Sequence, residues 1–120
     1  MIILSINFNI EGVADYYVGI LQGTELHLTD VPTAALLFNE KQCAQLVHAI
    51  QLLKVQGKFD PTKVHDYSAI FEKAGLPPMM PYAMETLMNH IETTAELGEN
   101  PQIKFVVNEV ALVPSKVINY

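Results

Sequence analysis

The sequence predicts an α+β fold in which an antiparallel sheet is packed on one face by about three helices. Segments near both ends of the chain place apolar residues at every second position, as strands with one buried face do. Between them, three longer segments repeat apolar residues at helical spacing and are separated by Gly and Pro. The 120 residues fit one domain, residues 1–120, because domains most often contain roughly 100–150 residues.

The N-terminal segments predict a β-meander. Residues 2–10 alternate apolar and polar side chains, residues 16–21 are rich in aromatic and β-branched side chains, and residues 25–29 alternate again. The polar residues of the first strand should face solvent; they are Ser5, Asn7 and Asn9. A turn around Pro32 leads into a fourth predicted strand, residues 34–38, which is short and apolar.

A capped helix follows this predicted strand. Asn39 is a good N-cap residue, and Gln42 stands three residues later, where it completes a capping box. Gly57 suits the left-handed position that ends a helix, so the helix should stop near Gln56. Its buried stripe is expected to consist of Cys43, Leu46, Val47, Ile50 and Leu53.

Two further helices are predicted downstream. Asp60 and Pro61 form an N-cap and first-turn pair for a helix through about Ala74, and a third helix starts at Pro81 and ends at Gly98. A rigid Pro-rich connector, residues 76–81, joins them. The expected buried residues are Val64, Tyr67, Ile70 and Phe71 in the second helix, and Met84, Leu87, Met88, Ile91 and Ala95 in the third.

The last predicted strand spans residues 103–113. Its apolar residues occupy odd positions up to Val107 and even positions from Val110, so a bulge or a tight turn at residues 108–109 is expected. The tail, residues 114–120, keeps enough apolar residues to pack against the domain or a neighbour.

Composition narrows the functional classes. Thirteen acidic residues stand against seven Lys, with no Arg, which gives a net charge of −6 and disfavours direct nucleic-acid binding. Half of the residues are hydrophobic, and the apolar surface left over in such a small protein favours a homo-oligomer, most simply a homodimer. A single Cys, no stretch of about 20 apolar residues and no signal-peptide pattern predict a cytoplasmic protein with no membrane contact.

Residues that could support catalysis or metal binding are better explained structurally. Cys43 belongs to an apolar helical stripe, and His48 is about 140° further around that helix, so the two form no local dyad. Glu25 and His27 share a strand face with Thr29, but no third ligand stands at metal-binding spacing. Phosphate-loop and nucleophile-elbow motifs are also missing. We therefore predict no catalytic residue, no metal and no cofactor.

The candidate partner-binding residues lie in the last third of the chain. Glu85, Glu92 and Glu96 fall within a narrow arc of the third predicted helix and form an acidic ridge in a segment without Lys. Met79 and Met80 stand between Pro78 and Pro81, on a short segment whose backbone the prolines restrict. A solvated helix face would explain the ridge equally, whereas a recognition role predicts a basic protein partner.

The order of hairpin, Ala-Leu-Leu-Phe segment and capped helix between Tyr16 and Leu53 resembles segments of small phage- or prophage-encoded accessory proteins. The resemblance implies no activity and assigns no functional residue. The leading hypothesis is a non-catalytic protein-binding module that occludes a partner's surface, as a phage accessory, inhibitor or immunity-type protein does. The alternatives are a structural subunit of a larger assembly, such as a virion component, and a small enzyme with a thiol or histidine site.

Overall fold

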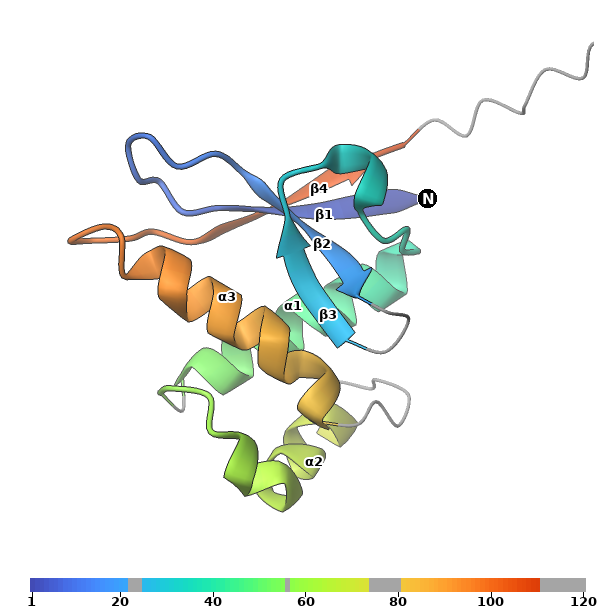
Figure 1. Ribbon diagram of the computed structural model, residues 1–120. Helices are drawn as coiled ribbons and strands as arrows, with labels where there is room; N and C mark the ends of the chain where they lie inside the picture. The colour runs from blue at the N-terminus through green and yellow to red at the C-terminus, as the bar shows by residue number, and fades with distance from the viewer. Residues whose placement is uncertain (22–24, 56, 74–80, 111–120) are drawn as a thin grey trace, which may run out of the picture.

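The computed structural model describes residues 1–21, 25–55, 57–73 and 81–110. These residues form an antiparallel sheet and three α-helices, which confirms the predicted α+β class (Figure 1). The strands are β1 (Ile2–Asn7), β2 (Tyr16–Leu21), β3 (Glu25–Thr29) and β4 (Lys104–Glu109). The α-helices are α1 (Glu40–Val55), α2 (Val64–Lys73) and α3 (Glu85–Ala95), and the 3₁₀ helices are η1 (Pro32–Ala34), η2 (Pro61–Lys63) and η3 (Pro81–Met84).

The strand order in the sheet is β3-β2-β1-β4. The first three strands form the predicted meander, and β4 returns from the C-terminal part of the chain to pair with the other side of β1. Consequently β3 and β4 are the two edges of the sheet. In Figure 1 the helices lie on one side of it, with α2 farthest from the strands.

The hydrophobic core lies between the sheet and the helices. The predicted alternation of β1 is confirmed on this face, where Ile2, Leu4, Ile6 and Phe8 are all buried. The helices bury the predicted stripes against them: Cys43, Leu46, Ile50 and Leu53 from α1, Tyr67, Ile70 and Phe71 from α2, and Met84, Leu87, Met88 and Ile91 from η3 and α3.

The prediction of a fourth strand over residues 34–38 is wrong. η1 occupies the start of this segment, after which Ala35 makes an isolated bridge with Gly19 and Phe38 makes another with Ile2. The two bridges go to different strands, because β1 and β2 pair only at two positions and then separate. Residues 35–38 therefore fill the space between β1 and β2 without forming a continuous ladder with either.

Ser5 does not face solvent as predicted, since it is buried. β4 pairs with β1 on one side, and the side-chain amide of Asn108 donates to Ser5 Oγ at 3.1 Å. A polar residue in the middle of the central strand is thus covered by a cross-strand polar partner rather than by water.

The predicted irregularity at residues 108–109 is also wrong. β4 pairs with β1 in one unbroken register, from Asn7 opposite Lys104 to Ile2 opposite Glu109. The part of the predicted strand from residue 111 lies outside the described residues. β4 is an edge strand, and Val106 on the outer face and Val107 on the helix face are both substantially exposed. A valine at such an edge fits the preference of β-branched residues for strands and does not indicate that the position is buried.

The predicted helix boundaries hold at several points. The Asn39 side chain accepts from the backbone N–H of Gln42 at 2.8 Å, and the Gln42 side chain accepts from the backbone N–H of Asn39 at 3.1 Å, which confirms the capping box. Gly57 has a φ of 98°, as expected after the end of a helix. α3 ends at Ala95, three residues before the predicted Gly98.

Several predictions lie outside the described residues. They are the connection at residues 22–24, the Pro-rich connector before Pro81 with Met79 and Met80, and the tail at residues 114–120.

Candidate partner-binding surface

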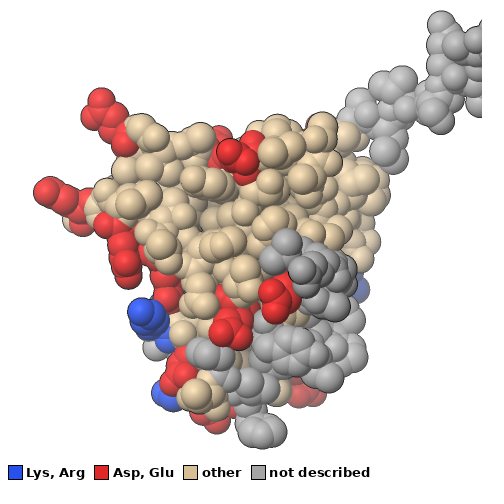
Figure 2. All heavy atoms as spheres, in the orientation of Figure 1, with Lys and Arg blue, Asp and Glu red and all other residues tan. Residues whose placement is uncertain are grey.

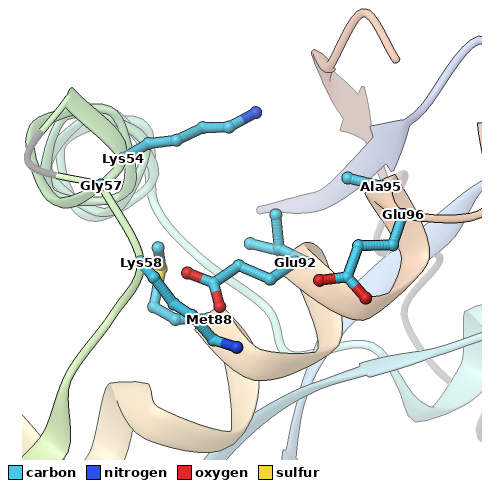
Figure 3. A pocket seen from close by; sticks show the side chains of 8 residues that line it. Lys54, Gly57, Lys58, Met88, Glu92, Ala95 and Glu96 are labelled. Carbon is cyan, nitrogen blue, oxygen red and sulfur yellow. The ribbon is translucent and has the colours of Figure 1, made fainter. Parts of the chain in front are cut away.

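The predicted acidic ridge runs along α3, beside a hollow of about 330 Å³ (Figure 3). Apolar side chains of α3 form its floor, and charged side chains of both signs stand around it. In Figure 3 Lys54 extends from α1 toward the α3 side of the hollow. The lining residues are Lys54, Gly57, Lys58, Met88, Ile91, Glu92, Ala95 and Glu96.

Glu92 has a structural partner. Its Oε1 accepts a hydrogen bond of 2.7 Å from the backbone N–H of Phe59, and the side chain is half-buried. The Phe59 ring stacks on Tyr67 with centroids 4.8 Å apart, and Tyr67 Oη accepts from the backbone N–H of Asp60 at 2.7 Å. Glu92 therefore ties α3 to the connection between α1 and α2, so part of the ridge stabilises the fold.

The other two ridge residues differ in exposure. Glu85 is half-buried in the first turn of α3, where a carboxylate suits the positive end of the helix dipole. Glu96 is exposed at the C-cap of α3, and the last turn contains no basic residue. The helix dipole disfavours a carboxylate at this end. Local helix stability thus explains Glu85 but not Glu96.

Glu96 belongs to a cluster that the sequence analysis missed. Gly98, in the connection from α3 to β4, lies against Ile10 in the connection from β1 to β2: a Cβ at position 98 would be 2.7 Å from Ile10 Cγ1. Both connections carry exposed carboxylates, and Figure 2 shows acidic groups gathered along this side of the molecule. We call this group the acidic end; it consists of Glu11, Asp15, Glu96 and Glu99. Asp15 also has a structural partner, because its Oδ1 accepts a hydrogen bond of 2.6 Å from the side-chain amide of Asn7.

The basic groups beside the ridge belong to α1 and to the residues just after it. Partial burial of its ammonium lowers the pKa of Lys54 from the ordinary value of 10.5. Lys54 and Lys58 both line the hollow together with Glu92 and Glu96. The hollow is therefore of mixed charge, whereas the two connections that form the acidic end carry no Lys between residues 8 and 15 or between residues 96 and 103.

Cys43 lies where the sequence placed it, in the core, with 2% of its surface exposed. Burial raises the pKa of its thiol from the ordinary value of 9.0, which lowers the thiolate fraction at neutral pH. His48 is exposed on the outer face of α1. The structure does not bring the thiol and this imidazole together as a nucleophile and base.

Glu25 and His27 both interact with α3. Thr86 Oγ1 donates to Glu25 Oε2 at 2.9 Å, and the rings of His27 and His90 have centroids 6.4 Å apart. His90 Nδ1 accepts from the backbone N–H of Leu28 at 3.2 Å. Within residues 1–21, 25–55, 57–73 and 81–110, no three His, Cys, Asp or Glu side chains are grouped as metal ligands.

No protein-family model matches the chain, and no curated protein or solved structure is significantly similar to it. Among the helices of the described segments, none has the length and apolar character needed to cross a membrane.

Proposed function

We propose that the protein is a non-catalytic protein-binding module that occludes a basic surface of another protein. In this role it would act as a small phage accessory, inhibitor or immunity-type protein. The acidic end and the adjoining α3 ridge form the contact, with Met79 and Met80 as further candidates.

The acidic end is the observation that carries this proposal. Four exposed carboxylates from two connections, more than 80 residues apart in sequence, lie on one end of the molecule without a Lys in either connection. Glu96 also stands at a helix end where the dipole disfavours it. Grouping like charges costs stability through repulsion, and such a surface attracts a basic partner by raising the association rate.

A charge-reversal experiment tests the proposal. The tagged protein is used to capture partners from a lysate of the native host, in salt steps, with mass spectrometry as the readout. The variant combines Glu11→Lys, Glu96→Lys and Glu99→Lys, and its control combines Asp66→Lys with Glu72→Lys on the exposed face of α2. Glu92 is left unchanged because it accepts from Phe59.

We expect basic proteins to be captured by the wild type and the α2 control, released by moderate salt, and lost with the acidic-end variant. Exposed charges act over about 8 Å at physiological ionic strength, which explains the salt sensitivity. Equal capture by all three proteins would contradict the proposal.

A structural subunit of a larger assembly is the second candidate, and the unpaired edge of β4 favours it. A subunit that joins sheets through this edge should form large oligomers at physiological concentration. A chain whose mass never exceeds that of a dimer would argue against a virion-type component.

A further inference from the structure

We propose that β4 pairs antiparallel with β4 of a second copy of this chain, with the two-fold axis at Val106, so that two sheets join into one. This surface is separate from the acidic end, and the proposal stands independently of the function proposed above.

The first observation is that none of the described strands pairs with the outer side of β4. The N–H of Val110 donates to the carbonyl of Met1 at 3.0 Å, and the register with β1 is unbroken. In an antiparallel ladder every second residue points its N–H and C=O at the neighbouring strand. The even-numbered residues of β4 therefore bond to β1, and the backbone groups of Phe105, Val107 and Glu109 point toward the free edge.

The second observation is that the centre of this edge lacks the usual protection against pairing. Natural edge strands are blocked by Pro, bulges or inward-pointing charges. β4 has an unbroken register and no Pro, and its centre consists of valines: Val106 is 39% exposed and Val107 is 54% exposed. Its charged residues, Lys104 and Glu109, stand only at the two ends.

The third observation is a hollow of about 540 Å³ between β4 and α1, lined mainly by apolar side chains. On the face of α1 beside it, Glu40 in the first turn is the one charged residue that lines the hollow. Ala44, His48, Gln51 and Val55 follow each other at helical spacing on this face, and Val55 is 86% exposed. A strand added to β4 would place alternate side chains in this hollow, over α1.

The order of polar and apolar side chains along β4 indicates that the added strand is β4 of a second copy. Antiparallel pairing about Val106 puts Phe105 opposite the partner's Val107, Val106 opposite the partner's Val106, and Lys104 opposite the partner's Asn108. Among residues 104–108, apolar side chains then oppose apolar ones and polar side chains oppose polar ones, which is the favourable arrangement for cross-strand pairs. Glu109 falls opposite the partner's Ile103, which lies just outside the strand.

Neighbouring registers lose this match. Moving the axis to Val107 puts Phe105 opposite the partner's Glu109, and moving it to Phe105 puts Lys104 opposite the partner's Val106. Hydrogen bonds require the outward-pointing, odd-numbered residues of the two strands to oppose each other, and all three registers meet this condition. The matching of side chains therefore selects the axis at Val106. An axis perpendicular to the sheet keeps both sets of helices on one side, so the faces of the two α1 helices that carry Ala44, His48 and Gln51 approach each other. This gives an isologous interface.

The oligomeric state of the full chain tests the proposal. In sedimentation velocity over a concentration series, we expect the wild type to reach twice the chain mass of 13.4 kDa. Val106→Lys, which sets two ammonium groups opposite each other at the axis, should reduce the mass to that of one chain while circular dichroism stays unchanged. The control Ile20→Lys, at another exposed strand position, should remain dimeric.

Disulfide trapping tests the register. Directly opposite residues of a non-hydrogen-bonded pair have Cα atoms about 4.5 Å apart, within the range that a disulfide spans. Val106→Cys should therefore form a covalent dimer under mild oxidation. Lys104→Cys should not, because residue 104 opposes the partner's residue 108 and lies four residues from the partner's residue 104. A wild type that stays monomeric, a Val106→Lys variant that stays dimeric, or equal cross-linking of both cysteine variants would overturn the proposal.

Discussion

The two edges of the sheet are completed in different ways. At β3 the edge is closed within the chain, because His90 of α3 accepts from the backbone N–H of Leu28 and Thr86 of α3 donates to Glu25. At β4 the described part of the chain supplies no such cover, and two valines remain exposed. One helix thus covers one edge with side chains and satisfies the N–H of Leu28 there, while the other edge has no such cover within the described residues.

This difference shows that the small size of the protein does not by itself leave a sheet edge open. What matters is which side chains lie beside each edge strand. The same chain of 120 residues covers β3 with side chains that can accept and donate hydrogen bonds. Beside β4 it places a face of α1 that is mostly uncharged after Glu40 in its first turn.

The largest expected effect comes from the core beneath α3, the helix that covers the β3 edge. Leu87 of α3 is fully buried, so Leu87→Ala should lower the free energy of unfolding by about 2–5 kcal/mol. Val107→Ala on the open edge, compared at concentrations that keep the chain monomeric, should change it by about 0.5 kcal/mol or less. Urea denaturation measures both, and equal losses would show that the edges do not differ.

The next effect concerns α1, which flanks the open edge. Asn39→Ala breaks the capping box with Gln42 and should cost about 1 kcal/mol. Gln42→Ala in the Asn39→Ala background should cost less than it does alone, because the two side chains cap the same turn. If the losses of unfolding free energy in the two single variants add up to the loss in the double variant, the two caps act independently. Thermal unfolding followed by circular dichroism gives the four values.

A smaller effect is expected for the helix-to-strand hydrogen bond. His90→Ala removes the acceptor for Leu28 and should cost about 0.5–1 kcal/mol, because the histidine is exposed and water replaces part of the bond. Asn89→Ala, at the neighbouring exposed position, is the control and should be neutral. If both variants unfold alike, the His90 contact contributes nothing to the closed edge.

The smallest effect lies away from both edges. The Thr62 hydroxyl and the Thr62 backbone N–H both donate to Asp60, and these hydrogen bonds hold the pKa of the Asp60 carboxyl below its ordinary value of 3.8. The folded state therefore binds this proton less tightly than the unfolded state. The stabilisation is complete above the ordinary pKa and is lost as the pH falls through the folded value.

Asp60→Asn should accordingly flatten the dependence of unfolding free energy on pH below about 4, while the dependence near neutrality stays the same. Urea titrations between pH 2 and pH 7 make the comparison. If the pH dependence of the unfolding free energy below about pH 4 is the same in Asp60→Asn, the Thr62 hydrogen bonds do not stabilise the charged form of the Asp60 carboxyl.

Elements specified by local chemistry were predictable from the sequence. The capping box at Asn39, the buried face of β1 and most of each helical stripe depend on neighbouring residues, and the structure has them. Val47 and Ala95 are only partly buried, and Ser5 is buried where the alternation predicted exposure. The region 34–38 was not predictable, because its apolar composition indicates a strand but its pairing depends on how far β1 and β2 separate.

The candidate surface was predictable only in part. The spacing of Glu85, Glu92 and Glu96 places them together on α3, but no local signal shows that Glu92 bonds to Phe59. The contribution of Glu11 and Asp15 depends on the contact between Ile10 and Gly98, which joins two connections far apart in sequence. Likewise, the exposure of Val107 follows from the position of β4 at an edge, which only the strand order reveals.

Amide hydrogen exchange tests the contrast between the two edges most directly. The backbone N–H of Leu28 is bonded within the chain, and that of Val107 points to the free edge. We predict slow exchange at Leu28 at every protein concentration, and exchange at Val107 that slows as concentration rises and becomes fast again in Val106→Lys. Exchange at Val107 that does not depend on concentration would contradict the account.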